Sequence, residues 1–300
     1  MTTAATTSGA QPISHNSSFP IERTTTSQPS APGWRPPQHT HRHNSLSPTP
    51  SETSSAEDED TAHASNYPTG KMALSGISLR AFLLGITLGI SACSTLFLVA
   101  VYPTPLWRAP FFISALSLFH FLEFFVTAKY NTRYATVSAF LLSSNGWAYN
   151  AAHGSALVEC LLSHFFWPNT SIISGVLSTT TLALGFILML MGQMVRTLAM
   201  AQAASNFNHH VQVEHKEGHV LVKEGLYRFL RHPSYFGFFW WGLGTQLVLG
   251  NVVCFVGYAV VLWRFFSSRI QREENFLVQF FGEEYILYRK TTPVGIPGIR

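Results

Sequence analysis

Long apolar stretches alternate with short polar ones along most of the chain, and this pattern predicts the architecture. An α-helix needs about 20 apolar residues to span a bilayer. Four stretches approach or exceed that length, at residues 81–101, 109–128, 135–165 and 172–195. The third is long enough to form a tilted or broken helix, and Asn145-Gly146 is its natural break.

A fifth apolar stretch, residues 236–262, is too short for two complete spans, which would need about 40 residues. We therefore expect a tight helical hairpin that enters the bilayer part-way, followed by an amphipathic helix at 263–281. The predicted fold class is all-α. We expect a polytopic integral membrane protein with about six membrane helices, including the hairpin, and a small cytosolic cofactor-binding region near the C-terminus.

The first 70 residues differ from the rest, because they are rich in Ser, Thr, Pro and His and carry an acidic run at Glu57–Asp60. Such a segment cannot bury a core, so residues 1–70 are predicted to be a disordered cytosolic tail. Residues 71–200 would then hold the N-terminal transmembrane helices. Residues 201–300 would form the cytosolic cofactor-binding and catalytic region, which contains the hairpin.

Composition and charge agree with a membrane protein. Hydrophobic residues make up 47% of the chain and charged residues 11%, whereas soluble domains carry about 25% charged residues. With the tail in the cytosol, the positive-inside bias is satisfied by Lys71, Lys129, Arg133 and Arg196. The basic residues form no stripe, so no nucleic-acid partner is expected.

The densest polar cluster is Arg231-His232-Pro233-Ser234-Tyr235. Proline suits the first position of a helix, since its missing N–H would be unpaired there in any case. A helix that begins at Pro233 would point its positive end toward Arg231 and His232. The cluster therefore predicts an anion-binding site.

A second cluster runs from Arg269 to Glu274, and we expect the two clusters to form one active site at a membrane surface. Within the second cluster, Arg269 and Glu273 lie four residues apart and hence on one helical face. They could form a surface salt bridge, which would contribute little stability. Alternatively each could bind a ligand: Arg269 a carboxylate, and Glu273 ribose hydroxyls or a cationic cofactor.

The segment His219–Val222 is short, apolar and β-prone, and it precedes Gly225 and Tyr227. It could be a buried strand, or a backbone edge that pairs with a flat ligand such as adenine. His215 and His219 lie four residues apart, but Gly218 weakens the helix that would align them. No metal site is therefore expected.

Ionisable residues also occur inside the apolar stretches, where they are costly and usually face the bundle interior. His120 and Glu123 share one helical face in the second stretch, and His153 and Glu159 lie in the third. They could line a substrate path or form structural hydrogen bonds between helices. The sequence has no GxGxxG after a strand, no P-loop and no GxSxG, so soluble nucleotide-binding folds are not supported.

Two long segments carry a family resemblance: SNFNHHVQVEHKEGHVLVKEGLYRFLRHPSYFGFFWWGLGTQLVLGN and WRFFSSRIQREENFLVQFFGEEYILYRKTTPVGIPGI. They resemble the isoprenylcysteine carboxyl methyltransferases of the endoplasmic reticulum. The match continues upstream through FHFLEF (119–124) and SNGWAYNAAHGSALVECLL (144–162), and it covers roughly residues 80–298.

The resemblance implies methyl esterification of the C-terminal prenylcysteine α-carboxylate of processed CaaX proteins, with S-adenosyl-L-methionine as donor. The implied partners are prenylated CaaX proteins such as Ras-like GTPases, prenylated peptides and membrane lipid. The implied location is the endoplasmic reticulum membrane, with several spans and an active site that faces the cytosol.

The resemblance also implies site residues. Arg269 matches the residue that holds the substrate carboxylate, so Arg269 and Glu273 are the candidate catalytic residues. The chain departs from the pattern at Lys223-Glu224, where relatives more often have a small polar pair. The cofactor-binding set would be Gln212, His219, Val220, Leu221, Val222, Tyr227, Arg231, His232, Pro233, Ser234 and Glu273.

Three other functions stay open. A membrane sterol reductase that uses NADPH has a related C-terminal pattern, although more spans would be expected. A phospholipid N-methyltransferase would keep the methyl donor but would not need a carboxylate-binding Arg269. A membrane scaffold or small transporter would leave the Arg, His and Glu clusters without a role.

Overall fold

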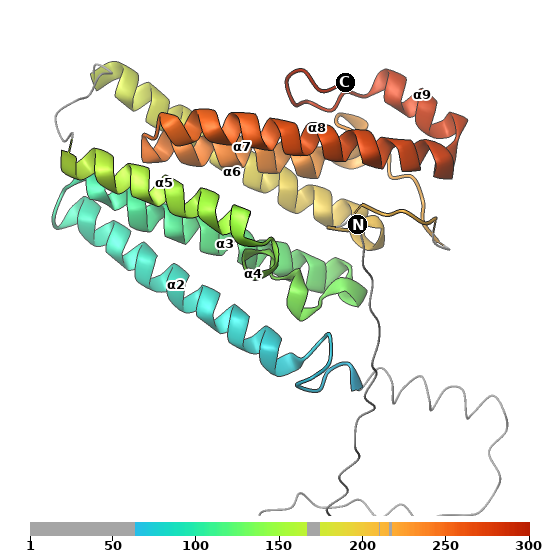
Figure 1. Ribbon diagram of the computed structural model, residues 1–300, viewed down its shortest axis with the longest axis horizontal. Helices are drawn as coiled ribbons and strands as arrows, with labels where there is room; N and C mark the ends of the chain where they lie inside the picture. Colours follow the sequence, from blue (N-terminus) through green and yellow to red (C-terminus); the bar gives the residue numbers. More distant parts are fainter. Residues whose placement is uncertain (1–63, 167–174, 210, 216–217) are drawn as a thin grey trace, which may run out of the picture. The chain divides into compact units, whose positions relative to one another are not determined.

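The computed structural model describes residues 64–166, 175–209, 211–215 and 218–300 (Figure 1). The predicted tail lies almost entirely outside these residues. In the described part of the chain, all regular secondary structure is helical, which confirms the all-α class. The α-helices are α2 (Leu74–Ala100), α3 (Arg108–Tyr130), α4 (Leu141–Ser144), α5 (Trp147–Phe166), α6 (Gly175–Ala203), α7 (Pro233–Leu249), α8 (Val253–Phe281) and α9 (Glu283–Thr291).

Short 3₁₀ turns connect some of these helices: η1 (Pro105–Trp107), η2 (Thr132–Tyr134), η3 (Val137–Ala139), η4 (Ala204–Asn206) and η5 (Gly225–Arg228). Within the described residues, 4 helical segments are long and apolar enough to cross a membrane: Leu74–Ala100, Pro105–Tyr130, Ser178–Asn206 and Val253–Phe281. The chain is therefore a membrane protein built from helices.

The break predicted in the third apolar stretch is confirmed. Helix α4 ends at Ser144 and α5 begins at Trp147. Gly146, between them, has a φ of 83°, in the left-handed region that glycine adopts without steric cost. The fourth stretch was predicted to end at Arg196, but α6 continues to Ala203 and Arg196 is buried inside it.

A helical hairpin is present at the predicted position, although its second arm, α8, is longer than predicted and is apolar enough to cross a membrane. Helix α7 ends at Leu249, Gly250 caps it with a left-handed φ of 76°, and α8 begins at Val253. The amphipathic helix expected at 263–281 is the continuation of α8 and not a separate element. The sequence from 258 to 281 contains neither glycine nor proline, so nothing interrupts the helix there.

The segment 219–222 does not form a strand. Its backbone is extended, and the N–H of Val220 donates to Asn206 Oδ1 at 3.0 Å. The side chain of Val220 is 58% exposed. Of the two alternatives for this segment, the buried strand is therefore wrong, because no neighbouring strand is present among the described residues to complete a ladder.

Helices α6 and α7 pack so closely that their backbones touch. A Cβ atom built on Gly192 would lie 2.5 Å from the carbonyl oxygen of Gly237 and 2.6 Å from the backbone nitrogen of Trp241. Gly185 and Gly244 form an equivalent contact about two helical turns away. Small residues let membrane helices approach in this way, and the approach brings α6 against the first turn of α7.

Gly192→Ala is expected to lower the apparent melting temperature of the purified protein by several degrees. The added methyl group meets backbone atoms that cannot move aside, and overpacking of this kind costs about 1–3 kcal/mol. Gly89→Ala is the matched control, since a Cβ at Gly89 would meet nothing within 4 Å. Equal melting temperatures for the two variants would contradict the close packing.

Candidate active site

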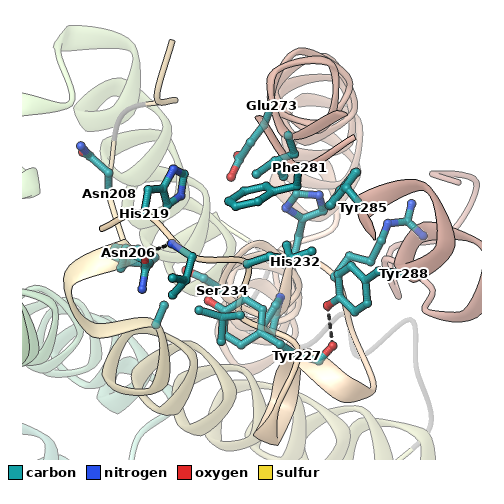
Figure 2. A pocket seen from close by; sticks show the side chains of 18 of the residues that line it. Asn206, Asn208, His219, Tyr227, His232, Ser234, Glu273, Phe281, Tyr285 and Tyr288 are labelled. Atoms are coloured by element: carbon teal, nitrogen blue, oxygen red, sulfur yellow. Dashed lines mark hydrogen bonds between the residues drawn. The ribbon is translucent and has the colours of Figure 1, made fainter. Parts of the chain in front are cut away.

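One pocket gathers most of the predicted site residues. Its walls come from the segment that follows α6, from η5 and the start of α7, and from the ends of α8 and α9 (Figure 2). It contains about 690 Å³ of space not filled by atoms, including the part open to solvent. Its lining residues are Ala203, Asn206, Phe207, Asn208, His219, Val220, Leu221, Val222, Tyr227, Arg231, His232, Pro233, Ser234, Tyr235, Glu273, Leu277, Phe281, Tyr285 and Tyr288.

Every predicted cofactor residue except Gln212 lines this pocket. Gln212 lines a smaller adjoining pocket, which shares His219 and Glu273 with the first. Figure 2 shows Glu273 and Phe281 on one side of the space and His219 with Asn208 on the other. Residues as far apart in the sequence as Ala203 and Tyr288, 85 positions (288 − 203), therefore meet around one cavity.

The start of α7 forms the floor of the pocket as expected. Pro233 is the first residue of the helix, and His232 before it is the N-cap residue, with φ −124° and ψ 61°. The prediction that a helix begins at Pro233 is thus confirmed. Its free N–H groups add positive potential at this end of the pocket.

A carboxylate to which the sequence analysis gave no role, Glu274 at the end of the second cluster, holds Arg231 and His232. Arg231 Nε donates to Glu274 Oε1 at 2.9 Å, and His232 Nε2 lies 3.3 Å from the same oxygen. Only one group of the guanidinium, Arg231 Nη2, is buried without a hydrogen-bond partner. Helical spacing could have indicated Glu274, because it follows the buried residues Phe266 and Ile270 at intervals of four.

Arg269 and Glu273 do not form the direct salt bridge that was one of the two predicted interpretations. Among the described residues, the hydroxyl of Tyr235 joins them: it donates to Glu273 Oε2 at 2.5 Å and accepts from Arg269 Nε at 2.8 Å. A further donor of Arg269, Nη2, binds the carbonyl oxygen of His209. Arg269 thus does not line the pocket itself but contacts Tyr235, which does. Tyr235 belongs to the predicted anion-binding cluster, although it was in neither the cofactor-binding nor the catalytic set.

The ionisable residues of the apolar stretches form hydrogen bonds between helices. Arg196 of α6 pairs with Glu123 of α3, with Nε 2.7 Å from Oε1, and His120 Nδ1 lies 3.1 Å from Glu123 Oε2. Arg196 Nη1 also donates to Ser234 Oγ at 2.9 Å. The buried pair therefore reaches the wall of the pocket through Ser234.

The second pair of ionisable residues is structural too. The carboxylate of Glu159 on α5 accepts hydrogen bonds from the backbone N–H groups of Val252, Val253 and Cys254, at 2.6–2.8 Å. These are orphan donors at the start of α8, which a helix cannot satisfy by itself. His153 Nδ1 lies 2.7 Å from the hydroxyl of Tyr258 and so joins α5 to α8.

The histidines considered for a metal lie in an aromatic cluster. The ring centroids of His215 and His219 are 5.6 Å apart, and each packs against Phe280 and Phe281. Throughout the described ranges, His, Cys, Asp and Glu side chains form no group of three that could hold a metal ion.

The tyrosines of the pocket wall stay protonated at neutral pH. Burial raises the pKa of the Tyr288 hydroxyl to about 12, and it raises the pKa of Tyr227 further above the ordinary value near 10. Burial and then the charge of Glu274 raise the pKa of Tyr285 as well. The neutral hydroxyl of Tyr288 donates to the carbonyl oxygen of Tyr227 at 2.5 Å, and that of Tyr227 donates to the carbonyl oxygen of Ala199 at 3.3 Å. The hydroxyl of Tyr285 is buried without a hydrogen-bond partner among the described residues.

Comparison with known proteins fits this site. Residues 183–279 match the model of the isoprenylcysteine carboxyl methyltransferase (ICMT) family. The protein-S-isoprenylcysteine O-methyltransferase of Saccharomyces cerevisiae is 45% identical over 225 residues, which cover 74% of this chain and 91% of the yeast protein. The chain belongs to the ICMT family.

Other comparisons agree with the assignment to the ICMT family. The human protein-S-isoprenylcysteine O-methyltransferase is 40% identical over 225 residues, 75% of each chain. A solved structure of the eukaryotic intramembrane Ras methyltransferase ICMT superposes with a TM-score of 0.68 at 32% identity, and it covers 83% of this chain and 85% of that one. The family assignment favours a methyltransferase over the sterol reductase and the non-enzymatic scaffold.

Removing one partner of the buried Glu123–Arg196 pair should destabilise the fold strongly. Glu123→Leu leaves the guanidinium without its counter-ion, which costs about 3–5 kcal/mol. Tryptophan fluorescence during thermal unfolding in detergent measures the effect. Adding Arg196→Met to Glu123→Leu is expected to recover much of the lost melting temperature, because the unpaired charge is then gone.

The control for this measurement is Glu284→Gln, which removes an exposed pair. Lys223 Nζ lies 2.5 Å from Glu284 Oε1, and the two side chains are 44% and 54% exposed. Exposed pairs contribute about 0–1 kcal/mol. Equal shifts for Glu123→Leu and Glu284→Gln would contradict the importance given to the buried pair.

Proposed function

We propose that this protein transfers the methyl group of S-adenosyl-L-methionine to the C-terminal α-carboxylate of prenylcysteine in processed CaaX proteins, and so forms a methyl ester. The observation that carries the proposal is the pocket of this ICMT-family chain. Arg231 and the start of α7 lie on one of its walls, and the carboxylate of Glu273 lies on another. Prenylated peptides and Ras-like GTPases are the acceptors that fit this chemistry.

Two unpaired buried atoms support binding of the donor. Arg231 Nη2 lacks a hydrogen-bond partner in the structure, and it lies at the positive end of α7, where it suits the methionine carboxylate. Gln212 Oε1 is buried and likewise unpaired, in the adjoining pocket that Glu273 also lines. The amide oxygen of Gln212 and the carboxylate of Glu273 suit the ribose hydroxyls, since both accept hydrogen bonds.

Arg269 and Tyr235 suit the acceptor. The guanidinium of Arg269 lies beside the pocket, and the Tyr235 hydroxyl that it contacts lies in the pocket wall. Arg269 would hold the prenylcysteine carboxylate in line with the sulfonium methyl group, while the Tyr235 hydroxyl, which accepts from Arg269 Nε, orients the guanidinium. Glu273, on the other side of the Tyr235 hydroxyl, places a negative charge near the cationic sulfur.

The reaction needs no general base. The acceptor carboxylate has an ordinary pKa of about 3.5, so it is ionised at neutral pH. One of its oxygens forms a bond to the methyl carbon as the bond from that carbon to sulfur breaks, and the electron pair stays on sulfur in S-adenosylhomocysteine. Positioning of the two reactants and exclusion of water then provide the catalysis.

The acceptor explains why the enzyme is a membrane protein. Each buried CH₂ of a prenyl chain contributes about 0.8 kcal/mol to membrane binding, whereas the donor is charged and soluble. We propose about six membrane helices, with α7 and the first half of α8 as the hairpin at 236–262. Residues 201–300 form the cytosolic catalytic region, 71–200 the N-terminal helices and 1–70 a cytosolic tail, in the endoplasmic reticulum membrane.

Arg269→Ala is expected to lower kcat/KM for N-acetyl-S-farnesylcysteine about 10- to 100-fold, because hydrogen bonds to a charged group contribute about 1.5–3 kcal/mol. The assay follows tritium from S-adenosyl-L-methionine into a base-labile methyl ester, in membranes that contain the protein. The control is Arg272→Ala, which removes an exposed arginine three residues further along the same helix.

The form of the product separates the proposed function from its nearest rival. A methyl ester releases its label in base, whereas the N-methyl product of a phospholipid N-methyltransferase does not. Transfer to lipid with none to farnesylcysteine would overturn the proposed acceptor. An unchanged kcat/KM for Arg269→Ala would instead overturn the role of that residue alone.

A further inference from the structure

The C-terminal residues 283–299, which we call the C-terminal strap, fold back over the start of α7. The strap comprises α9 and the segment that follows it. The backbone N–H of Arg231 donates to the carbonyl oxygen of Pro293 at 2.9 Å. The guanidinium Nη1 of Arg231 donates to the carbonyl oxygen of Arg289 at 3.2 Å and also to that of Thr292.

The strap is tightly packed against the rest of the protein. The side chains of Val294 and Ile296 are among the most buried of the described residues, at 1% and 2% exposure. Trp263 of α8 donates from Nε1 to the carbonyl oxygen of Pro297 at 2.8 Å. Gly295 has a φ of 83°, and a Cβ there would lie 2.6 Å from the side chain of Leu230. The strap therefore has one defined position against α7 and α8.

The strap also forms part of the pocket itself. Tyr285 and Tyr288 of α9 are buried and line the cavity, as Figure 2 shows. The hydroxyl of Tyr288 donates to the carbonyl oxygen of Tyr227 on the facing wall at 2.5 Å. A movement of α9 would therefore change the shape of the pocket directly.

Glu274 ties the strap to the pocket wall through its two oxygens. Oε1 accepts from Arg231 Nε and lies near His232 Nε2, whereas Oε2 lies 3.2 Å from Arg289 Nε on the strap. The side chain of Glu274 is 3% exposed and that of Arg289 is 47% exposed. Arg289 is thus the outer member of a chain of contacts that ends at the unpaired Arg231 Nη2 inside the site.

We propose that Arg289 is a positioning residue for the methyl donor. By holding Glu274 Oε2 it fixes the strap, and through Glu274 it fixes the orientation of Arg231 and His232 in the pocket wall. Arg289 itself does not line the pocket, and its contacts are with Glu274 and Arg231, on the donor side of the site. This inference rests on the proposed donor, and it assigns the strap to donor binding and not to acceptor binding.

The test is the methyl transfer assay on the full chain in membranes, with the concentrations of S-adenosyl-L-methionine and N-acetyl-S-farnesylcysteine varied separately. Arg289→Ala is expected to raise KM for the donor about 3- to 10-fold, since charged hydrogen bonds that are partly exposed have modest strength. The KM for the acceptor and kcat should stay within about 2-fold of the wild type.

Two further variants complete the design. Arg289→Lys keeps the positive charge and is expected to recover part of the donor affinity. Lys290→Ala removes the next basic residue, which is exposed, and it is expected to leave both KM values unchanged. Equilibrium binding of S-adenosylhomocysteine to the purified variants gives an independent measure that should follow the donor KM.

Three results would overturn the inference. One is a donor KM for Arg289→Ala that equals that of the wild type. Another is a fall in kcat and melting temperature without a change in donor KM, which would show a structural role only. A third is a parallel rise in both KM values. Failure of the proposed function is seen separately, because wild-type membranes would then form no labelled ester.

Discussion

Buried carboxylates hold the first turn of α7 from two sides, and the geometry of the site depends on this. On one side, Glu123 orients Arg196, which donates to Ser234. On the other, Glu274 accepts from Arg231 and lies near the ring of His232. A charge inside the protein is strongly unfavourable unless it is paired and hydrogen-bonded. The two carboxylates therefore restrict the position of the first turn of α7. Because this turn lines the pocket, that part of the site is held in place by the protein itself.

The close packing of α6 and α7 allows Arg196 to donate to Ser234. Arg196 meets Ser234 only because α6 and α7 approach with their backbones in contact at Gly192 and Gly237. A larger side chain at either glycine would separate the helices near the guanidinium. The apolar packing and the polar site thus depend on each other. The glycines set the distance between α6 and α7, and at that distance Arg196 can donate to Ser234.

Much of this structure could be predicted from the sequence. The apolar lengths predicted α2 and α3, glycine predicted the break before α5, and Pro233 predicted the start of α7. The family resemblance placed Glu273 in one site with Arg231 and His232, and all three line one pocket. The partners of the buried charges could not be predicted from residue patterns. The motif around Arg231 suggested an anion site, but the partner of that residue, Glu274, lies 43 positions away. The spacing of apolar and polar residues indicates which residues share a face of one helix. It does not indicate which residue of another helix pairs with a buried charge.

The irregular segment after α6, at the edge of the site, is also held by side chains from other helices. Backbone carbonyl groups outside regular structure need partners, and here the membrane helices supply them. Asn131, at the end of α3, donates from Nδ2 to the carbonyl oxygen of Phe207 at 2.7 Å. Arg269 of α8 donates to that of His209. The segment that closes one side of the pocket is therefore held by two helices that the chain places before and after it. For the proposed reaction, Arg269 then has two tasks, since the guanidinium that would hold the acceptor carboxylate also fixes the wall beside it.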